Sequence, residues 1–500
     1  MIKLLAATTR DRARLSEILG VATRFGLGWL LGRIGIGSAS DVDQDAATLP
    51  RRTREALEAL GPTFVKMGQI LATRGDLIGP EWTSELDQLH SDAPRLPFEA
   101  IREAVETALG EPPETAFASF DPEPLAAASM AQVHRATLRD GREVVLKIRR
   151  PGIRPQMEAD LRLLAGLAEA IEASNAEARR FQPLAMARQL ARALLEELDF
   201  THEGRNADRL REDLARNPDV VVPVIHWQWS SETLLVMDHV AGVKPDSTER
   251  LVEAGIDPQA IADLGADLVL EMVMINGRFH GDPHPGNLLC LPGNRLALLD
   301  LGSVGQVSAR RRDEFVGFLQ SLQSGDPGAL ADTLAVWSAD ADVPRNRIER
   351  AAGEVVARHG QGPLVLSKLV PDFLRLMRED GLVMPPDLLL MFKALMTMDG
   401  VLTRIAPGFD LSAAMRRAQG RILADRLSPE RWAATAQALV WELSRIGNGA
   451  PRLIQAAVRR LEAEPPAQAS SGAAILTAGR WIAWSILGGG GLIAAALIIG

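Results

Sequence analysis

Hydrophobic and polar positions follow helical spacing near the start of the chain and strand spacing further on. The patterns over 54–78 and 99–109 predict helices. Short β-rich runs follow over 125–150, where the turn dipeptides Asp-Gly and Pro-Gly bound the apolar run 144–148. We therefore predict a strand at 144–148 that belongs to a hairpin.

After residue 150 the sequence predicts further helices, then two strands, and then a mostly helical region. We predict helices over 156–172 and 183–212, strands over 220–225 and 233–238, and a small hairpin over 288–300 within a helical region that ends near 462. A small β-rich region is thus followed by a larger helical one.

The last stretch of the sequence is apolar enough to cross a membrane. Residues 481–500 contain no charge, and about 20 helical residues at about 1.5 Å each span the roughly 30 Å of bilayer hydrocarbon. Two tryptophans follow Arg480, which is typical of an aromatic belt, so we predict a transmembrane segment over 473–500. The alternative is a buried helix in a soluble protein. Four glycines at 488–491 count against it, because glycine destabilises such a helix.

The apolar stretch 16–36 is interrupted by charges and predicts an interfacial or packing helix.

Composition narrows the classes of function. The net charge is −9 with 24% charged residues, so no basic field is present to recruit nucleic acid, which we exclude as a partner. The single cysteine, Cys290, cannot form an internal disulfide, and this fits a reducing, cytosol-facing compartment. The chain has no tyrosine, which excludes a tyrosine nucleophile or general acid. The charged N-terminal residues do not resemble a secretory signal.

The strongest chemical signal is HGDPHPGN at 280–287, followed by Asp-Leu-Gly at 300–302. Phosphoryl transfer needs an acidic group to orient or deprotonate the acceptor, and oxygen ligands that hold Mg²⁺ across the phosphates. Asp282 and Asn287 have the spacing of a kinase catalytic loop, and Asp300 opens an Asp-x-Gly element. We therefore predict that Asp282 is catalytic and that Asn287 and Asp300 bind the metal.

This motif lies where a protein kinase would carry it, after a β-rich lobe. We therefore predict an α+β, protein-kinase-like two-lobed fold with extra N-terminal helices and a C-terminal transmembrane helix. The expected parts are an N-terminal helical or interfacial segment (1–53), a helical extension (54–124), a small nucleotide-binding lobe with inserted helices (125–240), a helical catalytic lobe (241–463), a linker (464–472) and the transmembrane segment (473–500).

Lys147 lies at the end of the predicted strand 144–148, where a flexible cation can reach nucleotide phosphates. An acid on a following helix would hold it. Asp199, Glu203 and Asn206 are spaced i, i+4 and i+7 and share one helical face. Glu197 is offset from that face, so we expect it to serve a different partner from Glu203.

The loop expected to bind phosphate has alanines where kinases have glycines. It reads LAAASMAQVH at 125–134, and its candidate nucleotide-binding residues are Ala126, Ala127, Ala128 and Ser129. Because alanine has a Cβ and less φ/ψ freedom than glycine, the loop should be stiffer and approach the phosphates less closely. We expect an unusual nucleotide pose.

A Lys-Met-Gly-Gln motif at 66–69 lies in a predicted helix, with Lys66 and Gln69 as i, i+3 neighbours. Gly68 lowers helix stability by about 1 kcal/mol relative to alanine, so it is expected to mark close packing. Together with the alanine loop, Glu-x-Asp at 197–199 and His-x-Asp-x-His-Pro-Gly-Asn, this motif resembles the UbiB family of atypical kinases. The resemblance runs from about residue 55 to 410 and includes PPDLLLMFKAL.

The resemblance implies that Lys66 and Gln69 fold over the site where a peptide substrate would lie. It implies that Lys66 pairs with Glu197 and Asp199, so these three join the catalytic candidates, while Lys147 pairs with Glu203. The family is associated with ubiquinone biosynthesis, with ATP binding and with ATPase activity, so the resemblance implies ATP and Mg²⁺ as cofactors. It also implies a cell inner membrane location with the catalytic domain facing the cytoplasm, and a membrane lipid or quinone precursor and quinone-biosynthesis enzymes as partners.

Two departures from the family stand out. Leu301 replaces the usual Phe of Asp-Phe-Gly, and a single span is visible where bacterial relatives commonly have two.

Two other classes of protein compete with a kinase or ATPase. His280, Asp282 and His284 alternate like metal ligands, which favours a metallohydrolase. A catalytically weak pseudokinase that organises lipid-modifying enzymes is the stronger rival, because the alanine loop and the helix of Lys66 count against ordinary protein phosphorylation.

Overall fold

The computed structural model describes residues 9–27, 48–72, 78–89, 93–174, 183–338, 343–360, 366–382 and 384–409, together with Ala414 and Arg417. The chain divides into two compact units, 1–423 and 424–500. The expected linker at 464–472 and the expected transmembrane segment at 473–500 lie outside the described residues. Within the described ranges, no helix combines the length and the apolar character that crossing a bilayer requires.

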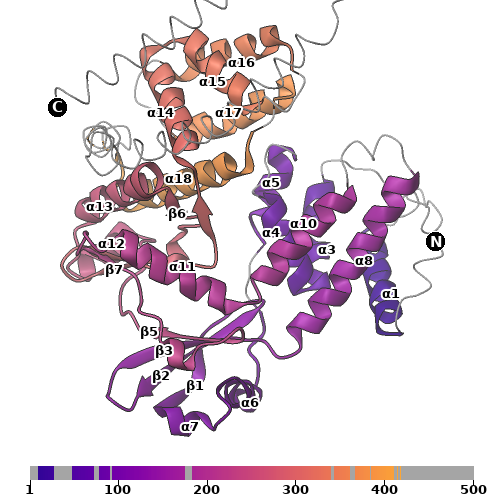
Figure 1. Ribbon diagram of the computed structural model, residues 1–500, viewed down its shortest axis with the longest axis vertical. Helices are drawn as coiled ribbons and strands as arrows, with labels where there is room; N and C mark the ends of the chain where they lie inside the picture. The colour runs from indigo at the N-terminus through magenta and orange to yellow at the C-terminus, as the bar shows by residue number, and fades with distance from the viewer. Residues whose placement is uncertain are drawn as a thin grey trace, which may run out of the picture. The chain divides into compact units, whose positions relative to one another are not determined.

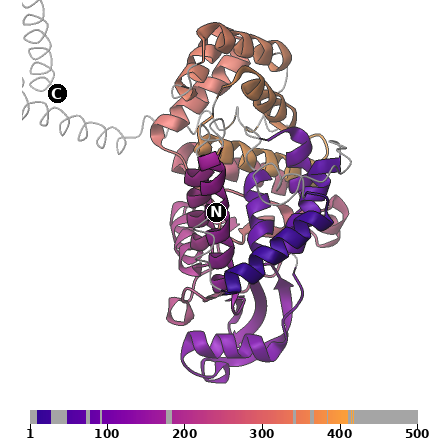
Figure 2. The same ribbon diagram turned by 90° about the vertical axis from the view of Figure 1, so that its right-hand side faces the viewer.

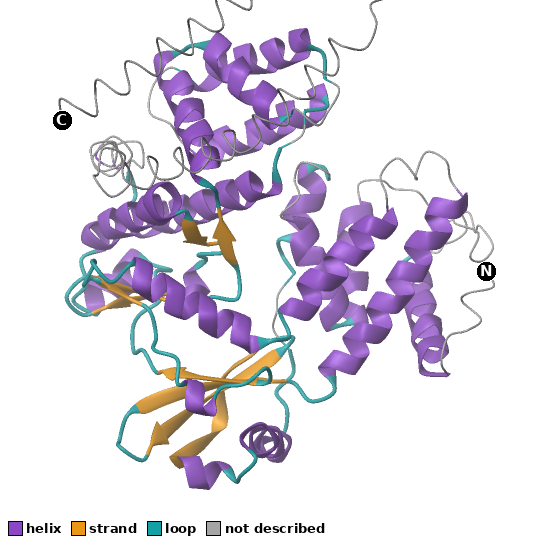
Figure 3. Ribbon diagram, in the orientation of Figure 1, coloured by secondary structure: helices purple, strands orange, loops and turns teal. Residues whose placement is uncertain are grey.

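The small lobe is an antiparallel sheet in the order β1-β2-β3-β5 (orange in Figure 3). Its strands are β1 (Phe117–Ala127), β2 (Ala131–Leu138), β3 (Glu143–Arg149) and β5 (Leu234–Asp238). The sheet begins at Phe117, ahead of the residue 125 expected from the sequence. Alternate residues of β3 are buried, namely Val144, Leu146 and Ile148, and they pack with Ile101 of α6 (Phe98–Leu109) in one core. Lys147 therefore lies on the opposite face of the sheet.

The N-terminal helices and the helices inserted after β3 form one helical group (Figures 1 and 2). The group consists of α1 (Thr9–Arg24), α3 (Leu49–Leu60), α4 (Pro62–Ala72), α5 (Pro80–Leu86), α8 (Ile153–Ser174) and α10 (Pro183–Glu196). Asp160 of α8 is fully buried, lies 2.6 Å from Arg14 Nε and accepts a 2.6 Å hydrogen bond from Thr63 Oγ1, so it joins three of these helices. The single helix expected over 54–78 is wrong, because Gly61 takes a φ of 93° and separates α3 from α4.

A second predicted helix, 183–212, is also divided. Helix α10 ends at Glu196, and α11 (Phe200–Asp213) begins after Asp199, whose carboxylate accepts a hydrogen bond from Thr201 N–H as the N-cap. Such a cap satisfies a backbone donor that the first helical turn leaves unpaired. The prediction of one continuous helix is therefore wrong, and Glu197 lies in the connection between α10 and α11.

The large lobe contains two small sheets. The predicted hairpin is confirmed as β7 (Leu288–Leu291) and β8 (Arg295–Leu298), and β8 also pairs in parallel with β4 (Val220–Val221). The strand expected over 220–225 is wrong beyond Val221, since Pro223 has no N–H for a ladder. The second sheet pairs β6 (Arg278–His280) with β9 (Val304–Gln306).

Helices make up the rest of the large lobe. They are α12 (Thr248–Glu253), α13 (Pro258–Leu270), α14 (Ala309–Ser324), α15 (Pro327–Trp337), α16 (Arg345–His359), α17 (Leu366–Asp380) and α18 (Pro386–Ile405). Phe318 and Phe392 each pack against the other and against Phe315, Trp337 and Phe373, with ring centroids 5.2 to 6.4 Å apart. This aromatic cluster joins α14, α15, α17 and α18, and the predicted α+β organisation is confirmed.

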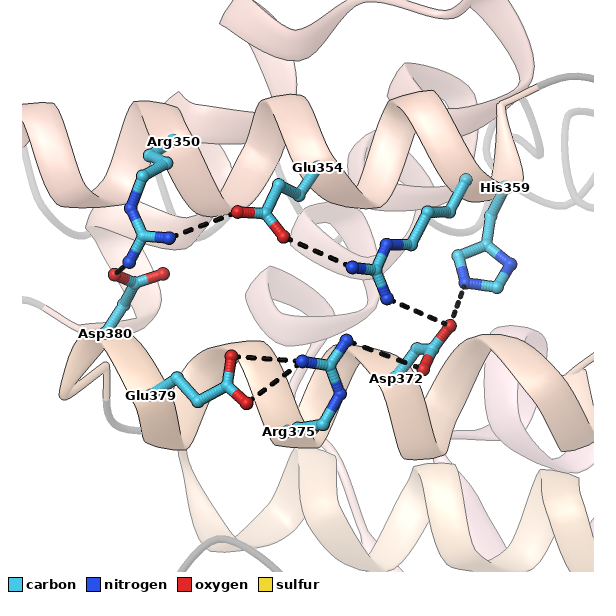
Figure 4. Close-up of polar contacts among 8 residues, drawn as sticks. Arg350, Glu354, His359, Asp372, Arg375, Glu379 and Asp380 are labelled. Carbon is cyan, nitrogen blue, oxygen red and sulfur yellow. Dashed lines mark hydrogen bonds and ion pairs between the residues drawn. The ribbon is translucent and has the colours of Figure 1, made fainter.

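Ion pairs also connect α16 to α17 (Figure 4). Asp372 lies 3.1 Å from His359 Nε2, and Arg350 contacts both Glu354 and Asp380. Arg350 and Glu354 are 54% and 36% exposed, so their pair contributes about 0 to 1 kcal/mol, whereas Asp380 is buried. Both helices also place buried apolar side chains in the large core, among them Val355 of α16 and Phe373 of α17.

Candidate functional site

A cavity of about 1330 Å³ brings together most of the residues singled out in the sequence. The sequence-predicted residues that line it are Lys66, Ala128, Ser129, Lys147, Glu197, Asp199, Glu203, Asp282, Asn287 and Asp300. They come from the turn after β1, the strand β3, the helices α4 and α11, the connection between α10 and α11, and the loops around β7 and β8.

Lys147 joins the small lobe to the large one. Its ammonium donates to Glu203 Oε1 at 2.9 Å and Oε2 at 2.7 Å, and it lies 3.4 Å from Asp300 Oδ1. The ammonium also lies 5.6 Å from the centre of the Phe200 ring. The predicted pair of Lys147 with Glu203 is confirmed, and one cation is shared by two carboxylates from α11 and from the Asp-Leu-Gly element.

Burial and charge act differently on these three groups. Lys147 lowers the pKa of Asp300 to about 2, although 52% of that side chain is open to the cavity. Burial raises the pKa of Glu203 to about 7, against the opposing effect of Lys147. Burial lowers the pKa of Lys147, but the charges of Asp300 and Glu203 outweigh that effect and raise it overall. Asp300 is therefore the carboxylate best able to stay ionised for a metal.

Hydrogen bonds fix the shape of the loop 280–287. His280 Nδ1 accepts from Asp282 N–H at 3.2 Å, so its Nε2–H donates to the Leu299 carbonyl at 3.1 Å. Burial lowers the pKa of His280, which favours this neutral form. Asn287 Nδ2 donates to the Asp282 carbonyl at 3.1 Å, which closes the loop and leaves the amide oxygen for a metal.

The same contacts count against the metallohydrolase alternative. Both ring nitrogens of His280 are engaged, so neither can bind a metal. His284 Nδ1 accepts from Gly286 N–H at 2.9 Å. No group of three or more His, Cys, Asp or Glu residues able to hold a metal ion occurs in the described part of the chain.

The Asp-Leu-Gly element is held in an uncommon backbone conformation. Asp300 has a φ of 47°, and such a left-handed residue other than glycine costs of order 1 kcal/mol. Leu301 is buried in the large core, and its carbonyl accepts from Asn206 Nδ2 at 3.1 Å. Leu301 thus fills an apolar position, and α11 contributes to holding Asp300 in place.

The helix α4 covers part of the cavity. Lys66 Nζ lies 2.9 Å from Glu197 Oε2, which confirms one of the two pairs that the resemblance implies for Lys66. Asp199 instead caps α11 and lies 3.6 Å from His202 Nε2. Glu197 and Glu203 do serve different lysines, as their offset predicted. A Cβ on Gly68 would overlap the side chain of Leu89, so the expected close packing is confirmed.

The alanine loop contributes Ala128, Ser129, Met130 and Ala131 to the cavity, and the candidates Ala126 and Ala127 do not line it. Ala128 N–H donates to the Ala131 carbonyl at 2.8 Å, and Arg150 Nε donates to the Ala128 carbonyl at 2.7 Å. Ala126 and Ala127 lie in β1, before the turn. Two hydrogen bonds therefore hold the turn, and the predicted stiffness of the loop stays a prediction.

One residue at the site was not among the candidates. Lys393 of α18 lies in the cavity, with its Nζ 3.1 Å from Asp282 Oδ1. The signal was present in the sequence, because Lys393 is the one charged residue between Asp387 and Asp399. A cation on such an apolar helix must either pair with an acidic side chain or face the solvent, because a buried unpaired charge is costly.

Comparisons with known proteins find two domain families and several relatives that match this chain. The ABC1 atypical kinase-like domain matches residues 88–334, and the UbiB helical domain matches residues 363–410. The Probable protein kinase UbiB of Xanthomonas campestris pv. campestris (strain B100) is 35% identical over 420 residues, covering 81% of this chain and 75% of the relative. The protein of that name in Xylella fastidiosa (strain 9a5c) is 32% identical over 481 residues, covering 93% of this chain and 86% of the relative.

A solved structure is similar in fold. It is the complex of Rv3197 with erythromycin from Mycobacterium tuberculosis, with a TM-score of 0.50 and 21% sequence identity over 75% of this chain and 98% of that chain. The matched domains and this structure establish a kinase-like α+β fold.

Proposed function

Because the chain belongs to the UbiB family of atypical kinases, we propose that it binds Mg²⁺-ATP in this cavity and transfers or hydrolyses the terminal phosphoryl group, in support of ubiquinone biosynthesis. The observation that supports this best is the contact of Lys147 with both Glu203 and Asp300. The phosphoryl acceptor would be water or a membrane-bound substrate.

The residues present fit a magnesium-bound nucleotide. Asp300, with a pKa of about 2, and Asn287 offer the carboxylate and amide oxygens that Mg²⁺ prefers. Bound Mg²⁺ would supply the charge that neutralises the phosphates. Lys147 would hold phosphate oxygens while Glu203 keeps its side chain in place, and Asp282 would orient the acceptor and take its proton.

The partners and the membrane enter the proposal from the sequence. The apolar segment 473–500 would anchor the chain at the inner membrane, with the catalytic domain in the cytoplasm. A membrane lipid or quinone precursor, and enzymes of quinone biosynthesis, would then be its partners.

A second function, that of a pseudokinase scaffold, is favoured by one contact. Lys66 of α4 lies 2.9 Å from Glu197 within the cavity, where a protein substrate of an ordinary kinase would approach. Such a scaffold would bind nucleotide and respond to it without turnover.

Replacing Asp300 tests the proposal. We expect Asp300→Asn to weaken Mg²⁺-ATP binding at least about 10-fold in calorimetry, because a charge-assisted metal contact is lost, and to stop quinone production in cells that lack the native protein. Asp219→Asn, an exposed change in the same lobe, is the matched control. Normal quinone production by the Asp300→Asn protein would refute an ATP-driven function.

The Asp282→Ala variant distinguishes an enzymatic function from a scaffold function. It removes the proposed acceptor-orienting group, so an enzyme would still bind Mg²⁺-ATP but lose both turnover and quinone production. A scaffold would keep quinone production.

A further inference from the structure

Helix α18 brings a cation to the catalytic loop from a distant part of the sequence. Lys393 is the one charged residue between Asp387 and Asp399, and its Nζ lies 3.1 Å from Asp282 Oδ1. The two side chains are 29% and 36% exposed, and both line the cavity that also contains Asn287. The ion pair is therefore open to a ligand on one side.

Close packing sets the position of this cation. A Cβ on Gly281 would lie 3.2 Å from Leu390 Cδ1 and 2.7 Å from Ser303 Oγ, so a larger residue has little room there. Leu390 and Lys393 are i, i+3 neighbours on one face of α18. Contact of Leu390 with Gly281 thus places Lys393 beside the next loop residue, Asp282.

The other lysines of the cavity already have carboxylate partners held by the fold. Lys147 contacts Glu203 and Asp300, and Lys66 contacts Glu197. Lys393 contacts Asp282, the group expected to meet the phosphoryl acceptor.

Asp87, which follows α5, also faces Lys393 and Asp282. Burial raises the pKa of Asp87, the charge of Lys393 opposes that rise and the charge of Asp282 adds to it. A further anion arriving here, such as the end of a polyphosphate, would meet two carboxylates and one ammonium. The cavity is also lined by Lys66, Arg375 and Arg378, but Lys393 is the cation that contacts Asp282, so its ammonium can compensate such an anion.

We propose that Lys393 binds the terminal phosphate of the nucleoside triphosphate and releases Asp282 as it does so. This assignment rests on the proposed function and adds to it a phosphate-binding residue from the helical region that follows the kinase-like domain. During transfer, the acceptor oxygen forms a bond to the terminal phosphorus, the bond to the bridging oxygen of the leaving diphosphate breaks, and the acceptor proton passes to Asp282. Lys393 would stay with the transferring group throughout.

The test compares two nucleotides, because a diphosphate lacks the group that Lys393 binds. Calorimetry is carried out on the full chain with Mg²⁺ and either ADP or the β,γ-imido analogue of ATP. We expect Lys393→Met to weaken binding of the analogue at least about 10-fold and that of ADP by less than about 2-fold. Lys393→Arg should restore part of the loss. Lys368→Met, which removes an exposed lysine of α17, should change neither affinity.

A second variant acts in the opposite direction and does not depend on the fold of Lys393→Met. Asp282→Asn removes the charge that competes for Lys393, so affinity for the triphosphate analogue should rise. Equal weakening of both nucleotides by Lys393→Met, no weakening at all, or a fall in analogue affinity with Asp282→Asn would overturn the assignment to Lys393. If the native chain binds neither nucleotide, the proposed function fails together with it, and this outcome is distinct from the other three.

Discussion

Lys147 Nζ lies 3.4 Å from Asp300 Oδ1, so a strand of the small lobe meets the Asp-Leu-Gly element of the large lobe through a single ion pair. The same ammonium donates to Glu203 at 2.7 Å. An amine and two carboxylates from three separate segments thus converge within one cavity. Each of these groups can be altered separately.

We expect Lys147→Met to weaken binding of both ATP and ADP at least about 10-fold, since it removes a charge-assisted contact to phosphate and leaves Glu203 and Asp300 to repel each other. Lys147→Arg should retain part of the affinity, because it keeps the charge. Calorimetry with Mg²⁺ measures both, and circular dichroism checks the fold. Unchanged affinity in Lys147→Met would place the nucleotide elsewhere.

The stiffness of the alanine loop can be tested at two neighbouring positions. Ala128 lies in the turn that lines the cavity, whereas Ala127 lies in β1. Ala128→Gly should loosen the turn and change the ratio of ATP to ADP affinity, while Ala127→Gly should change that ratio less. The ratio is measured by calorimetry. Equal ratios in the native chain and in Ala128→Gly would contradict the steric argument.

Gly305 is packed beneath an aromatic ring. It pairs with Phe279 across β6 and β9, and a Cβ at this position would overlap the fully buried Phe279 ring. We expect Gly305→Ala to lower the free energy of unfolding by about 1 to 3 kcal/mol, measured by denaturant titration. Gly317→Ala in helix α14 is the control, because the atom nearest to the new Cβ, Thr333 Oγ1, would be 3.9 Å away. Equal stabilities of the two variants would contradict this packing.

The one cysteine reports on the core of the large lobe. Burial raises the pKa of Cys290 from its ordinary 9.0 to about 12, so at pH 8 its thiolate fraction should be about 1,000-fold lower than that of an exposed cysteine. Iodoacetamide should therefore label the native protein slowly at pH 8 and faster as the pH rises, whereas the chain in guanidinium should react readily. Mass spectrometry measures the extent of labelling. Rapid labelling of the native protein at pH 8 would contradict the burial of Cys290.

The membrane anchor predicted from the sequence is tested by truncation. Removal of residues 473–500 should release the protein from membranes, because the uncharged stretch 481–500 is then absent. Fractionation of cells followed by immunoblotting measures the distribution. If the shortened chain stays with the membranes, the anchoring role passes to the stretch 16–36.

Motif spacing was sufficient to predict the centre of the site. The loop 280–287, the Asp-Leu-Gly element and Lys147 each carry a side chain of a type that phosphoryl transfer requires. We could therefore expect them to lie in one site, even though local sequence patterns do not show that they are close in space. The hairpin over 288–300 was predictable because Pro-Gly-Asn separates two apolar runs. Residues Gly293 and Asn294 do take positive φ in that turn.

Contacts distant in sequence explain the errors. The residues 183–212 keep helical periodicity throughout, and the break before Asp199 is held by Arg149 of β3, which donates to the Leu198 carbonyl at 2.7 Å. No local pattern reveals that contact. The sequence does mark Lys393 as a lone charge in an apolar helix, but its partner Asp282 is known only once α18 lies against the loop 280–287.

The break between α10 and α11 has a mechanical consequence. Leu198 is pinned to Arg149, which lies two positions from Lys147 on the same face of β3. Helix α10, which contacts α4, therefore meets α11 at a point that is hydrogen-bonded to β3, the strand of Lys147. If a ligand moved α4 away from the cavity, we would expect α10 to move with it. Because α10 connects directly to α11, the position of Glu203 would then change at the same time.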